Sequence, residues 1–264
     1  MSLIETNKSN ADVLLKALLM LSRTVPKLPS SILTAKASQI LSAISQLLSS
    51  PETDTLKMTL VVLRAILSCL SLKAWTSSPD PHQVFSSILS LTFDSREDVR
   101  NAAIQSCQHI LSRPPPPSLA HPASSTCLEM LYKLEASFSA AESGTACVPY
   151  LEALILILPA IVKNKLNEKA KKKLEQLALT LIKLPSKLLT HGGSFTAINL
   201  TFQALTPLVG AMREEGDDED SHSMPVVSLN VLNPILEALF EMKPNENDVL
   251  LVSSWSKLVA QGII

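Results

Sequence analysis

The chain has 264 residues, a formal net charge of −1 and 46% apolar residues, whereas aromatic residues make up 4% and glycines number six. This composition argues against a protein that binds nucleic acid along its whole length, because such proteins carry a large positive excess. It also disfavours sandwiches and barrels, which need glycine-rich turns and aromatic strands. We therefore predict an all-α fold.

Cysteine usage and hydropathy indicate the compartment. The four cysteines are far apart and form no C-x-x-C motif: Cys69, Cys107, Cys127 and Cys147. The first ten residues lack the basic and then apolar layout of a signal peptide. The most apolar run, 148–162, is too short to cross a hydrocarbon core of about 30 Å. We expect a soluble intracellular protein with free thiols, in a reducing compartment.

Apolar residues recur at helical spacing along most of the chain. The predicted helices, in order, cover residues 10–21, 30–48, 53–74, 85–93, 96–111, 124–140, 147–163, 166–184, 194–212, 226–242 and 247–264. Pro159 is expected to kink or end the helix that contains it. Helices recur roughly every 20 residues and pairs roughly every 40, which is the period of HEAT and armadillo repeats.

One helix pair, Phe85 to Leu111, carries this pattern most clearly. Asp94 or Ser95 is expected to cap its second helix, and the head of Arg100 is expected to reach carboxylates or free carbonyls. The inner side of that helix is predicted to hold Val99, Ala103, Cys107, Ile110 and Leu111. Neither helix can bury its apolar face alone, and the D-V-R-x-x-A start of the second resembles the HEAT repeat.

This resemblance implies a right-handed α-solenoid of HEAT/armadillo-like hairpins, forming one domain over residues 1–264. The last segment is still amphipathic and no polar capping helix follows it, so we expect a fragment of a longer array. Two stretches interrupt the array. Residues 113–123 are predicted to be a stiff proline-rich connector or a ligand for an aromatic groove. Residues 213–225 are predicted to be a disordered acidic loop, which could instead attract a basic partner.

Catalytic motifs are scarce. The segment His191-Gly192-Gly193-Ser194 is similar to an oxyanion-hole loop, but the chain has no G-x-S-x-G elbow to accompany it. A glycine turn capped by Ser194 is the simpler interpretation. The histidines show no metal-ligand spacing, and no phosphate-binding G-x-x-x-x-G-K-[ST] occurs. We predict a protein that is not an enzyme and that needs no cofactor, metal or small-molecule substrate.

A lysine cluster is the candidate binding site. It comprises Lys163, Lys165, Lys169, Lys171, Lys172 and Lys173, with Glu168 among them. Lysines at the start of a helix oppose its dipole, so helix stability does not explain them. They would suit contact with RNA phosphates or an acidic protein surface, and a solubilising face is the alternative.

Several segments together resemble the N-terminal HEAT-repeat region of the ribosomal RNA processing protein 12 family. The matching segments are 63–70 (LRAILSCL), 73–75 (KAW), 84–91, 99–103 (VRNAA), 121–123 (HPA) and 244–248 (PNEND) with Trp255. They occur in the family's order over most of the chain. The family's basic N-terminal extension and its C-terminal half have no counterpart here.

The resemblance implies a non-enzymatic scaffold of pre-ribosomes in the nucleus and nucleolus, with possible shuttling to the cytoplasm. It implies pre-ribosomal assembly factors as partners, with pre-rRNA and nuclear transport factors as further candidates and no membrane contact. The implied role is small-subunit maturation and export. A transport-type or generic protein adaptor without RNA contact is the alternative.

Overall fold

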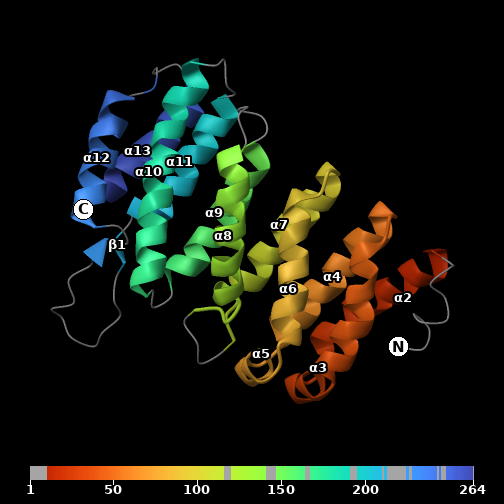
Figure 1. Cartoon of the computed structure of the whole chain (residues 1–264). Coiled ribbons are helices and arrows are strands. Elements are labelled where there is room, and N and C mark those ends of the chain that lie inside the picture. The colour runs from red at the N-terminus through yellow and green to blue at the C-terminus, as the bar shows by residue number, and fades with distance from the viewer. Residues whose placement is uncertain are drawn as a thin grey trace. The chain divides into compact units, whose positions relative to one another are not determined.

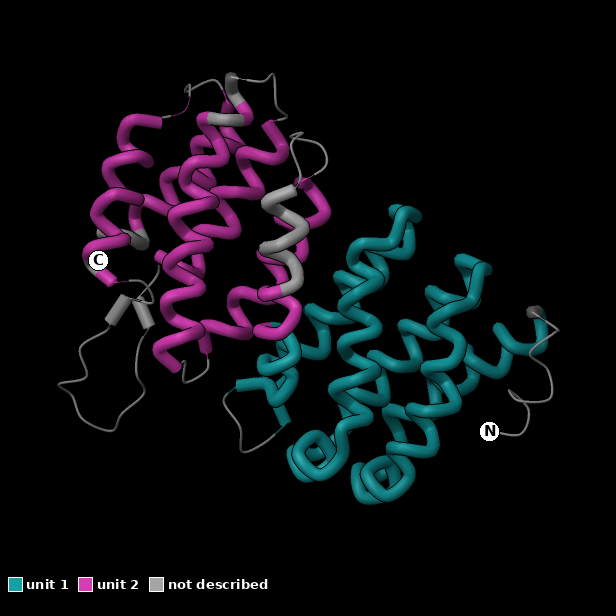
Figure 2. Tube along the Cα trace, viewed as in Figure 1, with its two compact units in different colours: residues 1–127 teal, residues 128–264 magenta. Residues whose placement is uncertain are grey.

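The computed structural model describes residues 11–115, 120–140, 147–163, 167–190, 195–209, 211–212, 224–225, 228–242, 244 and 248–263. These residues are almost entirely helical (Figure 1), which confirms the predicted all-α class. The chain divides into two compact units, residues 1–127 and 128–264, coloured separately in Figure 2. Each unit is described by itself below, and the single array over 1–264 stays a prediction.

Unit 1 consists of two rows of helices. One row packs α2 (Ala11–Thr24) against α4 (Thr53–Cys69) and α4 against α7 (Glu97–Leu111). The other packs α3 (Ser30–Ser45) against α6 (Asp80–Ser90), and these two also cover α4 and α7 respectively. Short 3₁₀ turns, η1 (Val25–Lys27), η2 (Gln46–Ser49) and η3 (Leu91–Phe93), follow α2, α3 and α6. This is the expected arrangement of stacked helical hairpins.

The apolar spacing of each helix determines the face it buries. In α3 the buried residues follow one another at intervals of three and four: Leu33, Ala37, Leu41 and Ile44. In α7 the predicted inner residues Val99, Ala103, Cys107 and Ile110 are all buried, whereas Leu111 is only half-buried. Removing these faces from water is the main favourable term in joining the rows.

The expected helix over 53–74 is instead two helices. Helix α4 ends at Cys69, Leu70 is extended, and a short helix α5 (Leu72–Ser77) follows. The Oγ atom of Ser71 accepts a hydrogen bond from the backbone N–H of Ala74, at 3.4 Å, and so caps α5. The apolar spacing continues through Leu70 and conceals this break. Helix α5 then contacts both α3 and α6.

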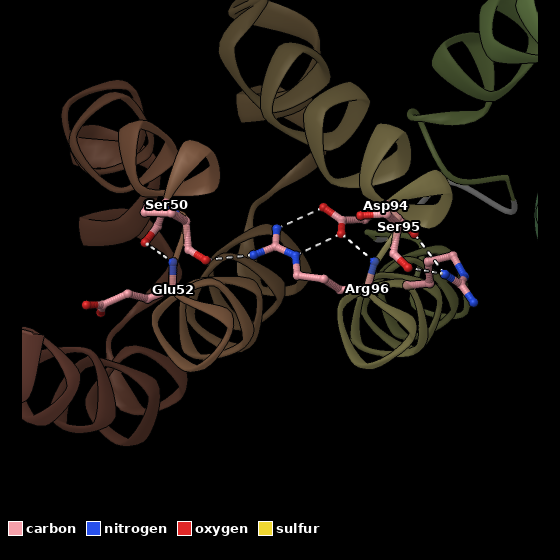
Figure 3. A network of polar contacts seen from close by, with 7 residues as sticks. Ser50, Glu52, Asp94, Ser95 and Arg96 are labelled. Carbon is pink, nitrogen blue, oxygen red and sulfur yellow. Dashed lines mark hydrogen bonds and ion pairs between the residues drawn. The ribbon is translucent and has the colours of Figure 1, made fainter.

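Three charged side chains hold the turn before α7: Asp94, Arg96 and Arg100. Figure 3 shows Asp94, Ser95 and Arg96 at this turn. The prediction that Asp94 or Ser95 caps α7 is wrong, because Arg96 occupies the N-cap position. Asp94 Oδ1 instead accepts the backbone N–H of Arg96 at 2.9 Å. Arg100 behaves as predicted: its Nη1 donates to the carbonyls of Asp94 and Ser95, at 2.9 and 3.0 Å.

Unit 2 has the same two-row plan. One row packs α9 (Val148–Val162) against α11 (Phe195–Val209), and α11 against α13 (Val249–Ile263). The other packs α10 (Glu168–Thr190) against α12 (Leu229–Glu241), and these helices contact α11 and α13 respectively. Helix α8 (Ser124–Ala140) contains the boundary between the units.

Prolines end fewer helices than expected. Helix α9 runs through Pro159 to Val162, and α10 runs through Pro185 to Thr190 instead of ending at Leu184. A proline inside a helix removes one backbone hydrogen bond. The side chain of Pro185 is buried, so its apolar packing partly offsets that loss.

Most of the acidic loop 213–225 lies outside the described residues, and so do residues 116–119 of the proline-rich segment. Of the acidic loop, Met224 and Pro225 form strand β2 and pair in antiparallel fashion with β1 (Ala211–Met212). The expected helix over 194–212 thus stops at Val209. Residues 213–223 and the prolines at 116 and 117 are not described, so disorder and the connector geometry stay predictions. Among the described residues, no helix is both long enough and apolar enough to span a bilayer.

Candidate interaction surface

The turn between α9 and α10 positions the lysine cluster. Lys163 is the C-cap residue of α9 and is exposed. Asn167 caps α10: its Oδ1 accepts the N–H of Ala170 at 2.8 Å, and its carbonyl accepts the N–H of Lys171 at 3.0 Å. The side chain thus satisfies the otherwise free N–H of Ala170, and the carbonyl accepts the first i→i−4 bond of the helix, which fixes where α10 begins. Lys165 lies outside the described residues.

The lysines of α10 do not all face the same way. Lys169, Lys172 and Lys173 follow the i, i+3, i+4 spacing and share one side of the helix. Lys171 lies on the other flank. Lys169, Lys171 and Lys172 are exposed, and Lys173 is half-buried. The inner face of α10 is apolar and buried, with Ala170, Leu174, Leu177 and Ala178 on it.

Two carboxylates lie beside these lysines. Glu168 Oε1 is 3.4 Å from Lys171 Nζ, and both side chains are largely exposed. Glu175 was not part of the predicted site; its Oε1 accepts the backbone N–H of Ser228 at 3.0 Å. Hydrogen bonds from Ser228 hold the pKa of Glu175 below its ordinary value, and the charge of Lys172 lowers it further. Glu175 is therefore ionised at neutral pH.

The five described lysines outnumber these two carboxylates, so the surface keeps an excess of positive charge. Lys171 is partly neutralised by Glu168, and Lys172 has Glu175 one turn further along the helix. An exposed pair of this kind contributes only about 0 to 1 kcal/mol, and a phosphate group could displace it. Lys169, Lys172 and Lys173 share one side of α10, and this side is the candidate for contact with a phosphate backbone.

A second polar cluster, in unit 1, was not predicted. The buried Trp75 ring lies edge-on to His121 and His82, with ring centroids 4.8 and 5.2 Å apart. His82 joins α6 to α5 and α8, because its Nε2 is 3.1 Å from the Trp75 carbonyl and its Nδ1 is 3.0 Å from Thr126 Oγ1. His121 Nδ1 accepts the N–H of Ala123 at 3.1 Å.

Hydrogen bonds and ring contacts hold the two histidines of this cluster in place. Burial lowers the pKa of His121 to about 4, with the neighbouring His82 as a smaller cause, so His121 is neutral at physiological pH. Burial also raises the pKa of Cys127 to about 12, which leaves it an unreactive thiol. This cluster anchors the chain that follows the proline-rich segment.

Chemistry could reside in a metal-binding cluster or in the His191–Ser194 segment. No group of three or more histidine, cysteine or acidic side chains within them is placed to hold a metal ion. The segment 191–194 lies outside them, so its interpretation as a glycine turn stays a prediction.

Solved structures with a similar fold are known. Two engineered proteins from the Northeast Structural Genomics Consortium are similar over nearly the whole chain, both at 15% identity and with a TM-score of 0.51. The matches cover 99% of this chain and 95% of the first protein, and 100% of this chain and 57% of the second. A designed armadillo repeat protein is 13% identical, with a TM-score of 0.46. That match covers 96% of this chain and 94% of the designed protein. The similarity to the two engineered proteins shows the fold alone, in agreement with the helical hairpins described above.

The particular family follows from the sequence. Residues 1–191 match the family described as "RRP12-like, N-terminal HEAT repeats". The match covers well over half of the chain, and the chain belongs to this family, as its sequence segments predicted. No curated protein matches it.

Proposed function

We propose that this chain is a non-enzymatic scaffold in ribosome biogenesis, acting in pre-rRNA processing and in maturation and export of the small subunit. The family match over residues 1–191 is the observation that carries the proposal. The mechanism is geometric: rows of helices present long surfaces on which several partners are held at once, and joint binding raises the affinity for each.

The proposed partners are pre-ribosomal assembly factors and, at the lysine surface of α10, pre-rRNA. Lys169 and Lys172 are exposed and Lys173 is half-buried on one side of α10. This side supports phosphate contact, because cations in a row suit successive phosphates. Lys163 lies in the same turn region and extends this candidate surface. Nuclear transport factors are further proposed partners, which fits a protein of the nucleus and nucleolus that shuttles to the cytoplasm.

Co-sedimentation tests the proposal. A tagged form of the chain, expressed in cells, should migrate with pre-ribosomal particles in a sucrose gradient. Nuclease treatment before affinity purification should then release part of the bound proteins, because RNA bridges some of them. Migration only at the top of the gradient would contradict the proposal.

A protein adaptor without RNA contact is the second candidate. Glu168 and Glu175 favour it, because they offset part of the charge of the lysine surface. For such an adaptor, nuclease would leave the set of co-purified proteins unchanged. The same purification therefore distinguishes the two functions.

A further inference from the structure

The corner between α2 and α3 exposes apolar and basic side chains together. Met20 is 68% exposed and Ile32 is 51% exposed, although most large aliphatic residues of unit 1 are buried. We call this set the N-terminal corner, and it consists of Leu19, Met20, Arg23, Lys27, Leu28 and Ile32. Residues 13–51 contain no acidic residue. Within the described part of the chain, neither Arg23 nor Lys27 forms an ion pair.

The corner between α12 and α13 has the opposite charge. Val249 is 75% exposed, and Phe240 is 55% exposed. This C-terminal corner consists of Glu237, Phe240, Glu241, Asp248, Val249 and Leu250. In sequence, residues 237–250 carry four acidic residues against the single Lys243. The described residues provide no cation within ion-pair distance of Glu237 or Glu241.

Apolar exposure is concentrated at these two corners. Of the eight large apolar side chains that are exposed among the described residues, seven lie in them, and Phe195 is the exception. The outward flank of α13 beyond the corner is lined by Ser253, Ser256 and Lys257. Exposed apolar side chains gathered in one place mark interaction surfaces, whereas single scattered ones do not.

We propose that the two corners bind each other between copies of this chain, the N-terminal corner of one copy to the C-terminal corner of the next. Each corner combines apolar side chains with charges that form no ion pair among the described residues, and the two corners carry charges of opposite sign. The apolar side chains leave water on contact, and Arg23 and Lys27 gain Glu237 and Glu241 as partners. Opposite charges also bring the two surfaces together in the correct pairing.

An interface between two different surfaces of one protein is heterologous. Each added copy leaves one free corner of each kind, so association continues until a ring closes or a filament forms. A chain that works as a scaffold would thereby present repeated copies of its binding surfaces. The pairing is independent of the proposed role in ribosome biogenesis.

Charge reversal tests this pairing in the full 264-residue chain by sedimentation velocity over a range of concentrations. The mean mass should rise with concentration and fall at high salt, which screens surface charges. The Arg23→Glu/Lys27→Glu variant should associate at least about tenfold more weakly, because like charges then meet. The Glu237→Lys/Glu241→Lys variant should show the same loss.

A mixture of the two charge-reversal variants provides the most specific test of the pairing. In the Arg23→Glu/Lys27→Glu variant both corners are acidic, and in the Glu237→Lys/Glu241→Lys variant both are basic. In the mixture, acidic corners of one variant meet basic corners of the other, so association should return. The Lys73→Glu/Lys183→Glu variant is the matched control: it has the same net charge as the first variant, and its changes lie at exposed lysines outside both corners. It should associate like the unmodified chain. A protein that stays monomeric, association that survives both reversals, or a mixture that stays monomeric would each overturn the proposal.

Discussion

Asp94 and Arg96 form a bidentate ion pair, and the third guanidinium nitrogen of Arg96 bonds to the segment that precedes α4. Arg96 Nε and Nη2 donate to Asp94 Oδ1 and Oδ2, both at 2.9 Å, and Nη1 donates to the carbonyl of Pro51, also at 2.9 Å (Figure 3). Pro51 lies 45 residues earlier in the sequence, just before α4. The pair thus ties the start of α7 to the start of α4, one repeat away.

Replacing Asp94 by asparagine should destabilise unit 1. The variant loses the negative charge and one of the two acceptor oxygens that orient Arg96 toward Pro51. We expect the free energy of unfolding to fall by about 1 to 2 kcal/mol, measured by urea denaturation at pH 7. Asp98→Asn is the control, because Asp98 is largely exposed and lies 3.9 Å from Lys57. Its effect should stay under about 1 kcal/mol, and an equal loss in both variants would contradict this role.

The same pair predicts a dependence on pH. Hydrogen bonds from Arg96 lower the pKa of Asp94 to about 2 from an ordinary value of 3.8. The folded chain therefore binds a proton here less readily than the unfolded chain. The stabilisation is complete above the ordinary pKa and is lost as pH falls from 3.8 toward 2. The gap in stability between the unmodified chain and Asp94→Asn should narrow over this range, in urea titrations at successive pH values.

His121 should make unit 1 less stable at mildly acidic pH. Its folded pKa of about 4 lies below the ordinary 6.5, so its contribution is complete above pH 6.5 and is lost toward pH 4. The full loss is about 3 kcal/mol, because each unit of pKa corresponds to about 1.4 kcal/mol. His121→Asn keeps an acceptor for the N–H of Ala123 but does not titrate.

Thermal melts followed by circular dichroism at several pH values between 7 and 4 measure this effect. At pH 7 the His121→Asn variant should have a lower melting temperature than the unmodified chain, because it loses the ring that packs on Trp75. Between pH 7 and 4, however, its melting temperature should fall by less than that of the unmodified chain. His82 faces the same cluster, and burial with the charges of Arg113 and Arg64 also lowers the pKa of His109. The slope that remains in His121→Asn includes the contribution of His109. An unchanged slope would show that His121 is not the group that titrates.

The helical plan of the chain could be read from spacing because each helix buries one face. Val99, Ala103 and Cys107 illustrate this, since their intervals of four residues alone placed them inside. The errors occurred where a local hydrogen bond outweighs the apolar pattern. Ser71 starts α5 through one side-chain contact, although the apolar residues continue past it. Pro185 is accommodated because its side chain is buried, a property that depends on the tertiary fold.

The candidate surface was only partly visible in the sequence. The division of the lysines between two sides of α10 follows from helical geometry, once residues 168–190 are known to be one helix. Glu175 could not have been assigned from the sequence, because Ser228, which binds it, lies 53 residues away. The same holds for Trp75, His82 and His121, which three separate segments bring together.

Trp255 should stabilise the last hairpin through a single hydrogen bond. Its Nε1 donates to the carbonyl of Leu239 at 2.7 Å, in the last turn of α12, where helix carbonyls lack partners within the helix. Trp255→Phe should reduce the free energy of unfolding by about 1 kcal/mol or somewhat more. Ser256→Ala is the control, because that hydroxyl is exposed and bonds only within α13. Equal urea midpoints for the two variants would show that the indole N–H contributes nothing.

The lysine surface predicts a measurable salt effect on RNA binding. Each phosphate contact releases counterions, so for single-stranded RNA the slope of log K against log salt falls by about 0.7 for each contact removed. The Lys169→Ala/Lys172→Ala/Lys173→Ala variant should therefore bind more weakly and show a slope flatter by about 2. Fluorescence anisotropy with a labelled single-stranded RNA, at several salt concentrations, measures both quantities.

Two controls separate a specific surface from general charge. Lys183→Ala removes an exposed lysine nearer the other end of α10 and should leave the slope unchanged. Lys171→Ala should have a smaller effect than loss of Lys169, because Glu168 already lies beside Lys171. If the triple variant keeps the original slope, these lysines do not contact phosphates, and the cluster is a solubilising face. The triple variant, Lys183→Ala and Lys171→Ala could instead all flatten the salt slope by the same amount for each lysine removed. Binding would then be non-specific, because no particular side of α10 would face the RNA.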